Sequence, residues 1–307
     1  MAITAFRNMK PFSQLFFTVF VIFVSFVVFM ILSLIVAIPM FGLNPVLDIA
    51  SATNFNDPET LRMLKFFQVV QSIGLFIIPP FIVAILFYGN IREYLHLNSF
   101  FSINSLFLVV ILMLFVAPFV NFIGEINQQM HLPEWMSGVE RWMKNSEEQA
   151  AQLTEAFLKM DTFGALLFNI IMIAVLPAIG EELLFRGVFQ RIFADITHSH
   201  HGGIWIAAAL FSAMHMQFYG FIPRLLLGVL FGYLLVWSGS MWLPIVAHFV
   251  NNALATIAVF MVDKGMVKPE VEDIGSTAES YYVAAISLVA TVVLLWLIKK
   301  GGDRQKA

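Results

Sequence analysis

Long apolar runs constrain this chain more than any other feature of its sequence. The first of them, residues 15–43, reads LFFTVFVIFVSFVVFMILSLIVAIPMFGL and contains no charged residue. About 20 apolar residues in a helix are enough to cross the hydrocarbon core of a bilayer. The run is also far longer than the roughly 7–15 apolar residues of a secretory signal peptide, so we expect a retained membrane span.

Similar apolar runs recur along the rest of the chain. Candidate helices lie near residues 15–41, 66–88, 103–123, 163–190, 203–218, 221–238, 241–262 and 280–298. The fifth and sixth candidates are short, and only the segment YGF separates them. The chain is 60% hydrophobic and 12% charged, whereas soluble domains are roughly 25% charged. We therefore expect an all-α, polytopic membrane protein, a bundle of about eight transmembrane helices.

The distribution of basic residues predicts the orientation of this bundle. If the N-terminus is cytoplasmic, the inner segments carry Arg7, Lys10, Arg92, Arg186, Arg191, Lys299, Lys300, Arg304 and Lys306. The loops on the other side are rich in acidic residues. The positive-inside rule then places both termini in the cytoplasm, and the pattern suits a multi-pass protein of a bacterial plasma membrane.

Composition also excludes several classes of function. The formal net charge is -3 and no basic stripe is present, so the sequence gives no support for nucleic-acid binding. The absence of cysteine excludes disulfides, thiolate zinc sites and a cysteine nucleophile.

Residues 124–161 form the one sizeable loop outside the predicted spans. Between residues 134 and 160 the apolar side chains recur at mostly helical spacing among charges, which predicts a helix at the extracytoplasmic membrane surface. We interpret it as a structural cover, with a substrate-binding element as the alternative. No repeat or linker marks a second folded unit, so residues 1–307 are expected to form a single membrane domain.

Polar side chains inside the predicted spans are the candidates for function, because a charge at mid-bilayer costs about 2.5–3.5 kcal/mol on insertion scales. The first cluster is PAIGEELLFRGVFQR, residues 177–191. Glu182 and Arg186 are four residues apart and share a helical face, so they can form an ion pair. Glu181 points about 100° away from Glu182, so one arginine cannot pair equally well with both. Glu181 is then either free for chemistry or a second structural carboxylate.

Two further clusters follow on later spans. The segment FSAMH places Phe211 and His215 four residues apart, and HFVNN places Asn251 and Asn252 three and four residues after His248. Each cluster has a structural alternative, because buried histidine and asparagine side chains also hydrogen-bond across membrane helices without any catalytic role.

Together the clusters provide the groups needed to hydrolyse a peptide bond. A glutamate can act as a general base on water, a histidine can help to hold or deprotonate that water, and histidine and asparagine donors can stabilise an oxyanion. If a divalent metal such as zinc is present, Glu181, His215 and His248 are the residues that would bind it. The sequence does not separate these two mechanisms.

The same three segments carry a family resemblance. EELLFR, FSAMH and HFVNN resemble the EExxxR, FxxxH and HxxxN motifs of the CPBP intramembrane proteases, also called the CAAX-protease and bacteriocin-processing or Abi family. The resemblance covers residues 163–260, which we expect to form the protease core. Glu182 and Arg186 match the remaining positions of the first motif, where a structural ion pair is the modest interpretation.

The resemblance implies an intramembrane endopeptidase and assigns residue roles. Glu181 and His215 match the pair that activates water, and His248 and Asn252 match the pair that stabilises the oxyanion. The family is described both as metalloproteases and as glutamate-dependent proteases, which leaves the cofactor open. From the depths of these residues in their spans, we also expect a catalytic cavity that opens towards the cytoplasm.

The expected partners are membrane lipid and a membrane-associated peptide or protein as substrate. Prenylated CAAX peptides are the substrate of the eukaryotic relatives, but no feature of this sequence indicates a prenyl-binding pocket. A noncatalytic membrane scaffold or immunity protein and a proton-coupled transporter are the alternatives, since both also place polar residues inside a helical bundle.

Overall fold

The structure is a computed structural model that describes residues 6–49, 55, 57–99 and 101–306, with side chains described as far as residue 302. Arg304 and Lys306, two of the basic residues used to predict the orientation, therefore have no described side chains. The secondary structure of the described part is entirely helical, which confirms the predicted all-α class.

Seven helices of the described part are long and apolar enough to cross a membrane. They are Pro11–Phe41, Pro58–Phe87, Ile103–Gln128, Phe163–Thr197, Phe218–Ser238, Trp242–Asp263 and Tyr281–Gly302. The chain is thus a multi-pass membrane protein, as predicted, with seven such helices where the sequence suggested about eight.

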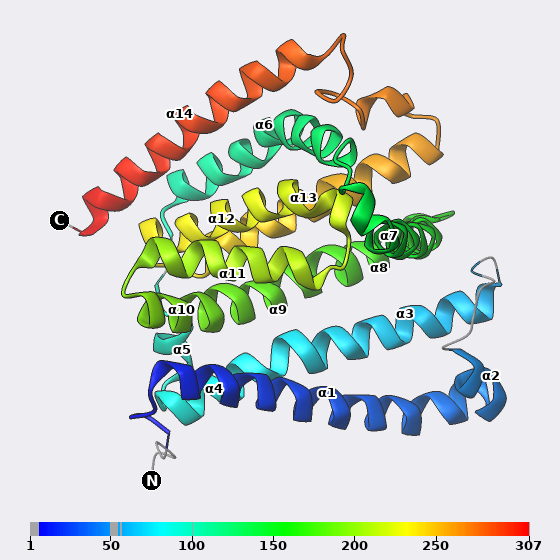
Figure 1. Cartoon of the computed structure of the whole chain (residues 1–307), viewed down its shortest axis with the longest axis horizontal. Helices are drawn as coiled ribbons and strands as arrows, with labels where there is room; N and C mark the ends of the chain where they lie inside the picture. The colour runs from blue at the N-terminus through cyan, green and yellow to red at the C-terminus, as the bar shows by residue number, and fades with distance from the viewer. Residues whose placement is uncertain (1–5, 50–54, 56, 100, 307) are drawn as a thin grey trace.

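The difference lies in the fifth predicted span, residues 203–218. It corresponds to α11, His200–Met214, whose 15 residues extend only about 22 Å, less than the roughly 30 Å hydrocarbon core. The helix nevertheless runs alongside α10 and α12 and returns the chain along the bundle (Figure 1). As a result, the start of α1 and the end of α14 lie at the same end of the molecule, here called the terminal end (Figure 1).

Two of the long helices contain π-helical turns. One consists of α3 (Pro58–Ser72), η2 (Ile73–Ile77) and α4 (Ile78–Phe87), and the other of α8 (Phe163–Asn169), η4 (Ile170–Val175), α9 (Leu176–Leu184), η5 (Phe185–Phe189) and α10 (Gln190–Thr197). Both η2 and η4 come shortly before prolines, Pro79 and Pro177 respectively. Because proline has no N–H, it cannot bond the carbonyl four residues earlier, and a locally widened turn accommodates the change.

The remaining helices complete the bundle and cover one of its ends. They are α1 (Pro11–Phe41), α2 (Leu43–Asp48), α5 (Ile91–Tyr94), α6 (Ile103–Gln128), η3 (Glu134–Met136), α7 (Ser137–Leu158), η6 (Phe218–Gly220), α12 (Phe221–Ser238), α13 (Trp242–Asp263), η7 (Pro269–Val271) and α14 (Tyr281–Lys306). The α7 helix comes from the loop predicted to be helical and crosses the bundle at the end opposite the terminal end (Figure 1). We call that opposite end the α7 end.

Capping residues extend the second long helix beyond its apolar run. It was expected near residue 66 but begins at Pro58, because the Asp57 side chain accepts a hydrogen bond from the backbone N–H of Thr60 at 2.8 Å. Lys65 consequently lies inside the helix, where its ammonium group donates to Phe157 O at 3.0 Å and to Asn169 Oδ1 at 3.1 Å. These bonds tie the end of α7 to the bundle.

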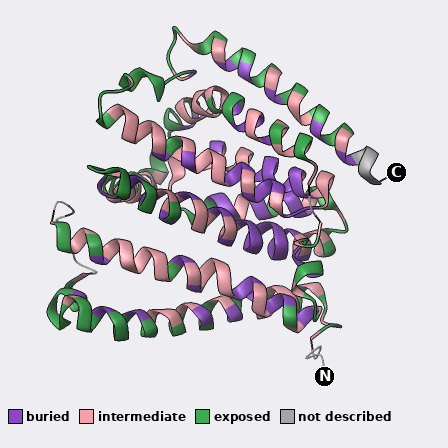
Figure 2. Cartoon of the chain, turned by 180° about the vertical axis from the view of Figure 1, so that it is seen from behind, coloured by how far each residue is buried: buried purple, intermediate pink, exposed green. Residues whose placement is uncertain are grey.

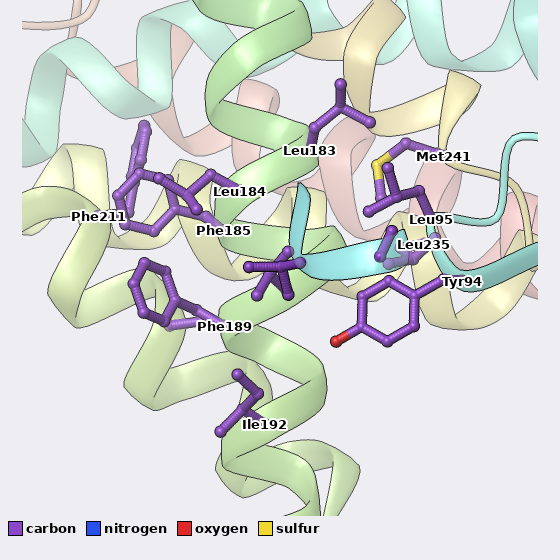
Figure 3. Close-up of a cluster of buried hydrophobic side chains, with 14 of the residues drawn as sticks. Tyr94, Leu95, Leu183, Leu184, Phe185, Phe189, Ile192, Phe211, Leu235 and Met241 are labelled. Carbon is purple, nitrogen blue, oxygen red and sulfur yellow. The ribbon is translucent and has the colours of Figure 1, made fainter. Parts of the chain in front are cut away.

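Buried residues concentrate on α9 to α12, whereas α1 and α14 expose most of their side chains (Figure 2). The largest cluster of buried side chains surrounds η5 and α10 and includes Tyr94, Leu95, Leu184, Phe185, Val188, Phe189, Ile192, Phe211 and Met241 (Figure 3). This dense core fills the bundle on the terminal side of the residues expected to be catalytic.

Close packing of α9 against η2 predicts a sharp effect of substitution at Gly180. A Cβ atom there would lie 2.8 Å from Phe76 Cβ and 3.0 Å from Ile77 Cγ1. Gly180→Ala should lower the free energy of unfolding by about 1–3 kcal/mol, the usual cost of overpacking, measured by unfolding in detergent. The matched control is Gly138→Ala on α7, where a Cβ has nothing within 4 Å. Equal stability of the two variants would contradict the packing described.

Candidate active site

A buried ion pair forms the centre of the site. Arg186 Nη1 lies 2.8 Å from Glu182 Oε1, and the two side chains are 1% and 0% exposed. Arg186 Nη2 donates to Gly228 O at 3.2 Å. The guanidinium carbon lies 4.6 Å from the centroid of the Phe211 ring and 5.4 Å from the centroid of the Phe231 ring. The charge that would oppose membrane insertion is therefore compensated by a carboxylate, a carbonyl and two aromatic faces.

Glu182 also holds a histidine from a different helix. Its Oε1 atom lies 2.8 Å from Nδ1 of His248 on α13. In this contact the ionised carboxylate accepts, so Nδ1 of the ring carries the hydrogen. Glu182 therefore fixes both the orientation and the tautomer of His248, and Nε2 is left for other partners.

Glu181 is the carboxylate that the arginine leaves unpaired. Its Oε2 atom is buried without a hydrogen-bond partner among the described residues and lies 3.9 Å from His248 Nε2. The separation is too long for a hydrogen bond but allows both atoms to contact one small group between them. Each glutamate therefore keeps one buried oxygen without a hydrogen-bond partner among the described residues, but Glu182 is bonded through its Oε1 atom whereas Glu181 lines a cavity.

His215, the C-cap residue of α11, has its tautomer set by the backbone. Its Nδ1 atom lies 2.9 Å from Phe211 O, four residues earlier on the same helix. A carbonyl oxygen can only accept, so Nδ1 carries the hydrogen and Nε2 of the neutral ring is an acceptor. The spacing of the FSAMH segment therefore produces a ring that can accept a hydrogen bond from water.

Asn252 is positioned through a carbonyl to which a proline cannot donate. Pro177 cannot donate to Ile173 O, the carbonyl four residues earlier, and Asn252 Nδ2 donates to this oxygen at 3.0 Å. Asn251 Nδ2 donates to Asn252 Oδ1 at 3.1 Å. The amide is held at both ends, and one of its two N–H groups is still free to donate.

One cavity brings these side chains together. Its volume is about 560 Å³, and its lining includes Glu181, His215, His248 and Asn252. Glu182 and Arg186 do not line it; they lie behind its wall and hold His248. The four residues predicted to be catalytic therefore share one cavity, although they come from three different segments of the chain.

The sequence predicts a cavity that opens towards the cytoplasm, the side on which both termini are also predicted to lie, but the cavity lies towards the end of the bundle opposite the termini. Its lining includes Leu153, Thr154 and Phe157 of α7, which crosses the opposite end of the bundle. The depth predicted for Glu181 is also inaccurate, because the fourth long helix continues to Thr197 rather than to residue 190. Glu181 is therefore about 24 Å of helix away from that end instead of about 13 Å.

Two cavity residues were missed at the sequence level. Asn251 does not occupy the asparagine position of the HxxxN motif, yet its side chain bonds to and orients Asn252. Arg224 lines the cavity and donates to Gln217 Oε1 at 2.6 Å. Arg224 is a charged residue inside a predicted span, so the rule that selected the other three clusters would also have found it.

The donor geometry does not match a three-ligand metal centre. Glu181 and His248 face each other, but within residues 6–49, 57–99 and 101–302 no three His, Asp or Glu side chains converge on one ion position. Structural and catalytic zinc sites need at least three protein ligands at about 2.0–2.2 Å.

Removal of the buried arginine should be strongly destabilising. Arg186→Met leaves Glu182 charged and buried, and breaking such a pair typically costs about 3–5 kcal/mol. The double variant Glu182→Gln/Arg186→Met has no lone charge and should recover part of this loss, as measured by unfolding in detergent. If the double variant loses as much free energy of unfolding as the two single variants lose together, the pairing is contradicted.

Comparison with known proteins shows which proteins part of the chain is similar to. Residues 163–254 match the family model described as Rce1-like: Type II CAAX prenyl endopeptidase Rce1-like. The chain is also 33% identical over 90 residues to Uncharacterized protein YpbD of Bacillus subtilis (strain 168). These aligned residues make up 28% of this chain and 43% of the relative. The chain thus matches less than half the length of this relative. No solved structure matches the chain.

Proposed function

We propose, from the premise that residues 163–254 form an Rce1-like type II CAAX prenyl endopeptidase domain, that the chain is an intramembrane endopeptidase. It hydrolyses a peptide bond of a membrane-associated peptide or protein. The observation that carries the proposal is the unpartnered Oε2 of Glu181, 3.9 Å from His248 Nε2, in a cavity that His215 and Asn252 also line. A carboxylate without a partner in an enclosed space is suited to act as a general base.

Glu181 activates the attacking water in this mechanism. The water lies between Glu181 and His215, whose Nε2 accepts one of its hydrogens. Glu181 takes the other proton while the water oxygen forms a bond to the carbonyl carbon of the substrate. This step produces a tetrahedral intermediate with a negatively charged oxygen, and it leaves Glu181 protonated.

His248 and Asn252 stabilise the negative oxygen. The free N–H of Asn252 donates to it, as does His248 Nε2 when the ring is an imidazolium. Glu182 orients the ring through its contact with Nδ1, in the way that a buried aspartate orients the histidine of a catalytic triad. Glu181 then returns its proton to the nitrogen of the leaving amine, the C–N bond breaks, and a carboxylic acid and an amine result.

The proposal places the protein in a bacterial plasma membrane with both termini in the cytoplasm. Basic residues support this orientation, since Arg7, Lys10, Arg92, Arg191, Lys299 and Lys300 all belong to segments at the terminal end. The positive-inside rule assigns such an end to the cytoplasm.

The decisive variant is Glu181→Gln, which keeps the shape of the side chain and removes the base. Incubation of the detergent-purified protein with peptides from digested membrane proteins should yield cleavage products, detected by mass spectrometry. Glu181→Gln should reduce cleavage by about 10²–10⁴-fold, the usual contribution of general acid–base catalysis.

Glu148→Gln is the matched control, because Glu148 is exposed on α7 and does not line the cavity. It should cleave as the wild type does. If Glu181→Gln folds normally and keeps the biological activity in cells, while neither it nor the wild type cleaves peptides, the protein is a noncatalytic scaffold. Peptide cleavage that Glu181→Gln retains in full would contradict the role of Glu181 as the base. Proton-coupled solute uptake by the reconstituted protein would instead indicate a transporter.

Removal of divalent metals should leave cleavage unchanged, because each step above uses only side chains of the protein. Protein dialysed against a chelator is expected to keep its rate within about twofold, and metal analysis should find less than one equivalent bound. Loss of cleavage that zinc restores, while the chelated protein keeps its helical circular dichroism spectrum, would contradict the glutamate mechanism and favour a metalloprotease.

A further inference from the structure

The catalytic cavity lies in the α7 half of the bundle. The α7 helix contributes Leu153, Thr154 and Phe157 to the lining, and the connection from α11 to α12 contributes His215 and Gln217. Both segments lie away from the start of α1 and the end of α14 (Figure 1). Thr154 and His215 are exposed as well as cavity-lining, so the cavity reaches the surface beside them.

The short α11–α12 hairpin explains why a hollow exists at this place. The 18 residues of α12 extend about 27 Å, whereas the 22 residues of α13 extend about 33 Å. The turn between α11 and α12 therefore stops short of the α7 end, and α7 crosses the space that remains. Trp142 packs on Phe218 with 5.2 Å between ring centroids, and Glu147 Oε2 accepts from Tyr219 N–H at 3.3 Å.

The terminal end is separated from the catalytic cavity. Arg186 lines a second cavity of about 510 Å³ together with His96, Arg191 and other residues near the terminal end. The two cavities share no lining residue. The Glu182–Arg186 pair lies between them, because Arg186 lines the second cavity and Glu182 bonds His248, which lines the first. The buried core around Phe185 lies beside this pair (Figure 3). A peptide entering from the terminal end would have to disrupt this core.

The charges of the two ends differ. Segments at the terminal end carry six described basic side chains outside the core but only two acidic ones, Glu93 and Asp195. The basic ones are Arg7, Lys10, Arg92, Arg191, Lys299 and Lys300. At the α7 end, basic residues are spread over long loops in which acidic residues outnumber them. Under the positive-inside rule, the terminal end is cytoplasmic and the α7 end faces outwards.

We infer that the catalytic cavity receives its substrate from the extracytoplasmic face, past α7. The substrate class is then a peptide, or a segment of a membrane protein, that is exposed on the outer side of the membrane. This inference rests on the proposed function for the cleavage itself, but it adds the side of the membrane on which cleavage takes place.

The absence of cysteine from the natural sequence makes the inference directly testable. Single cysteines are introduced as Thr154→Cys at the cavity and as Arg92→Cys, an exposed position of α5 at the terminal end. Spheroplasts are treated with a membrane-impermeant sulfonated maleimide before and after permeabilisation. Thr154→Cys should react at least tenfold faster than Arg92→Cys in intact spheroplasts, and permeabilisation should remove the difference.

A second outward-facing position guards against misfolding of the first variant. Glu148→Cys, which is exposed on α7, should behave as Thr154→Cys does. If Arg92→Cys reacts as fast as both α7 variants in intact spheroplasts, or if the α7 variants react only after permeabilisation, the inference is overturned.

The labelling result is combined with cleavage by the purified protein, so that the two proposals can fail separately. Glu181-dependent cleavage together with the reversed labelling pattern would refute the outward opening and leave the proposed function standing. Outward labelling without any Glu181-dependent cleavage would refute the proposed function and with it the substrate class. Outward labelling together with Glu181-dependent cleavage supports both.

Discussion

The hydrogen-bonded chain from Arg186 through Glu182 to His248 is the constraint on which the rest of the site depends. Arg186 compensates the charge of Glu182, and the same carboxylate oxygen orients His248, so one buried group links α9, η5 and α13. Both carboxylates keep one buried oxygen without a partner among the described residues, but Arg186 and His248 bond Glu182, and only Glu181 of the two lines the cavity. Neighbouring residues of the same type thereby acquire different roles from their environments alone.

Irregular backbone places the remaining groups. The π-helical turn η4 precedes Pro177, and the carbonyl to which this proline cannot donate receives the amide of Asn252. In a membrane, an unsatisfied carbonyl costs several kcal/mol, so this contact stabilises the bundle and positions a donor at the cavity at the same time. The short α11–α12 hairpin also has two effects. Its first helix ends at His215, which places this side chain at the cavity, and its turn leaves the space that α7 covers.

Much of this arrangement could be predicted from the sequence, because apolar length and four-residue spacing are local properties. The long helices and the shared face of Glu182 and Arg186 follow directly from them. Two helix ends differ from the prediction, because they depend on polar residues outside the apolar runs. The second long helix begins at the capped Pro58, and the fourth continues to Thr197. The side on which the cavity opens depends on how α7 folds back over the bundle, which no local pattern encodes.

The most direct test of the central claim is an experimental structure of the Glu181→Gln variant bound to a peptide that the wild-type protein cleaves. The account predicts that Arg186 and His248 both bond to Glu182, and that the peptide carbonyl lies between residue 181 and His248 with Asn252 donating to its oxygen. A structure in which Arg186 pairs with the residue at position 181, while Glu182 faces the peptide, would contradict it.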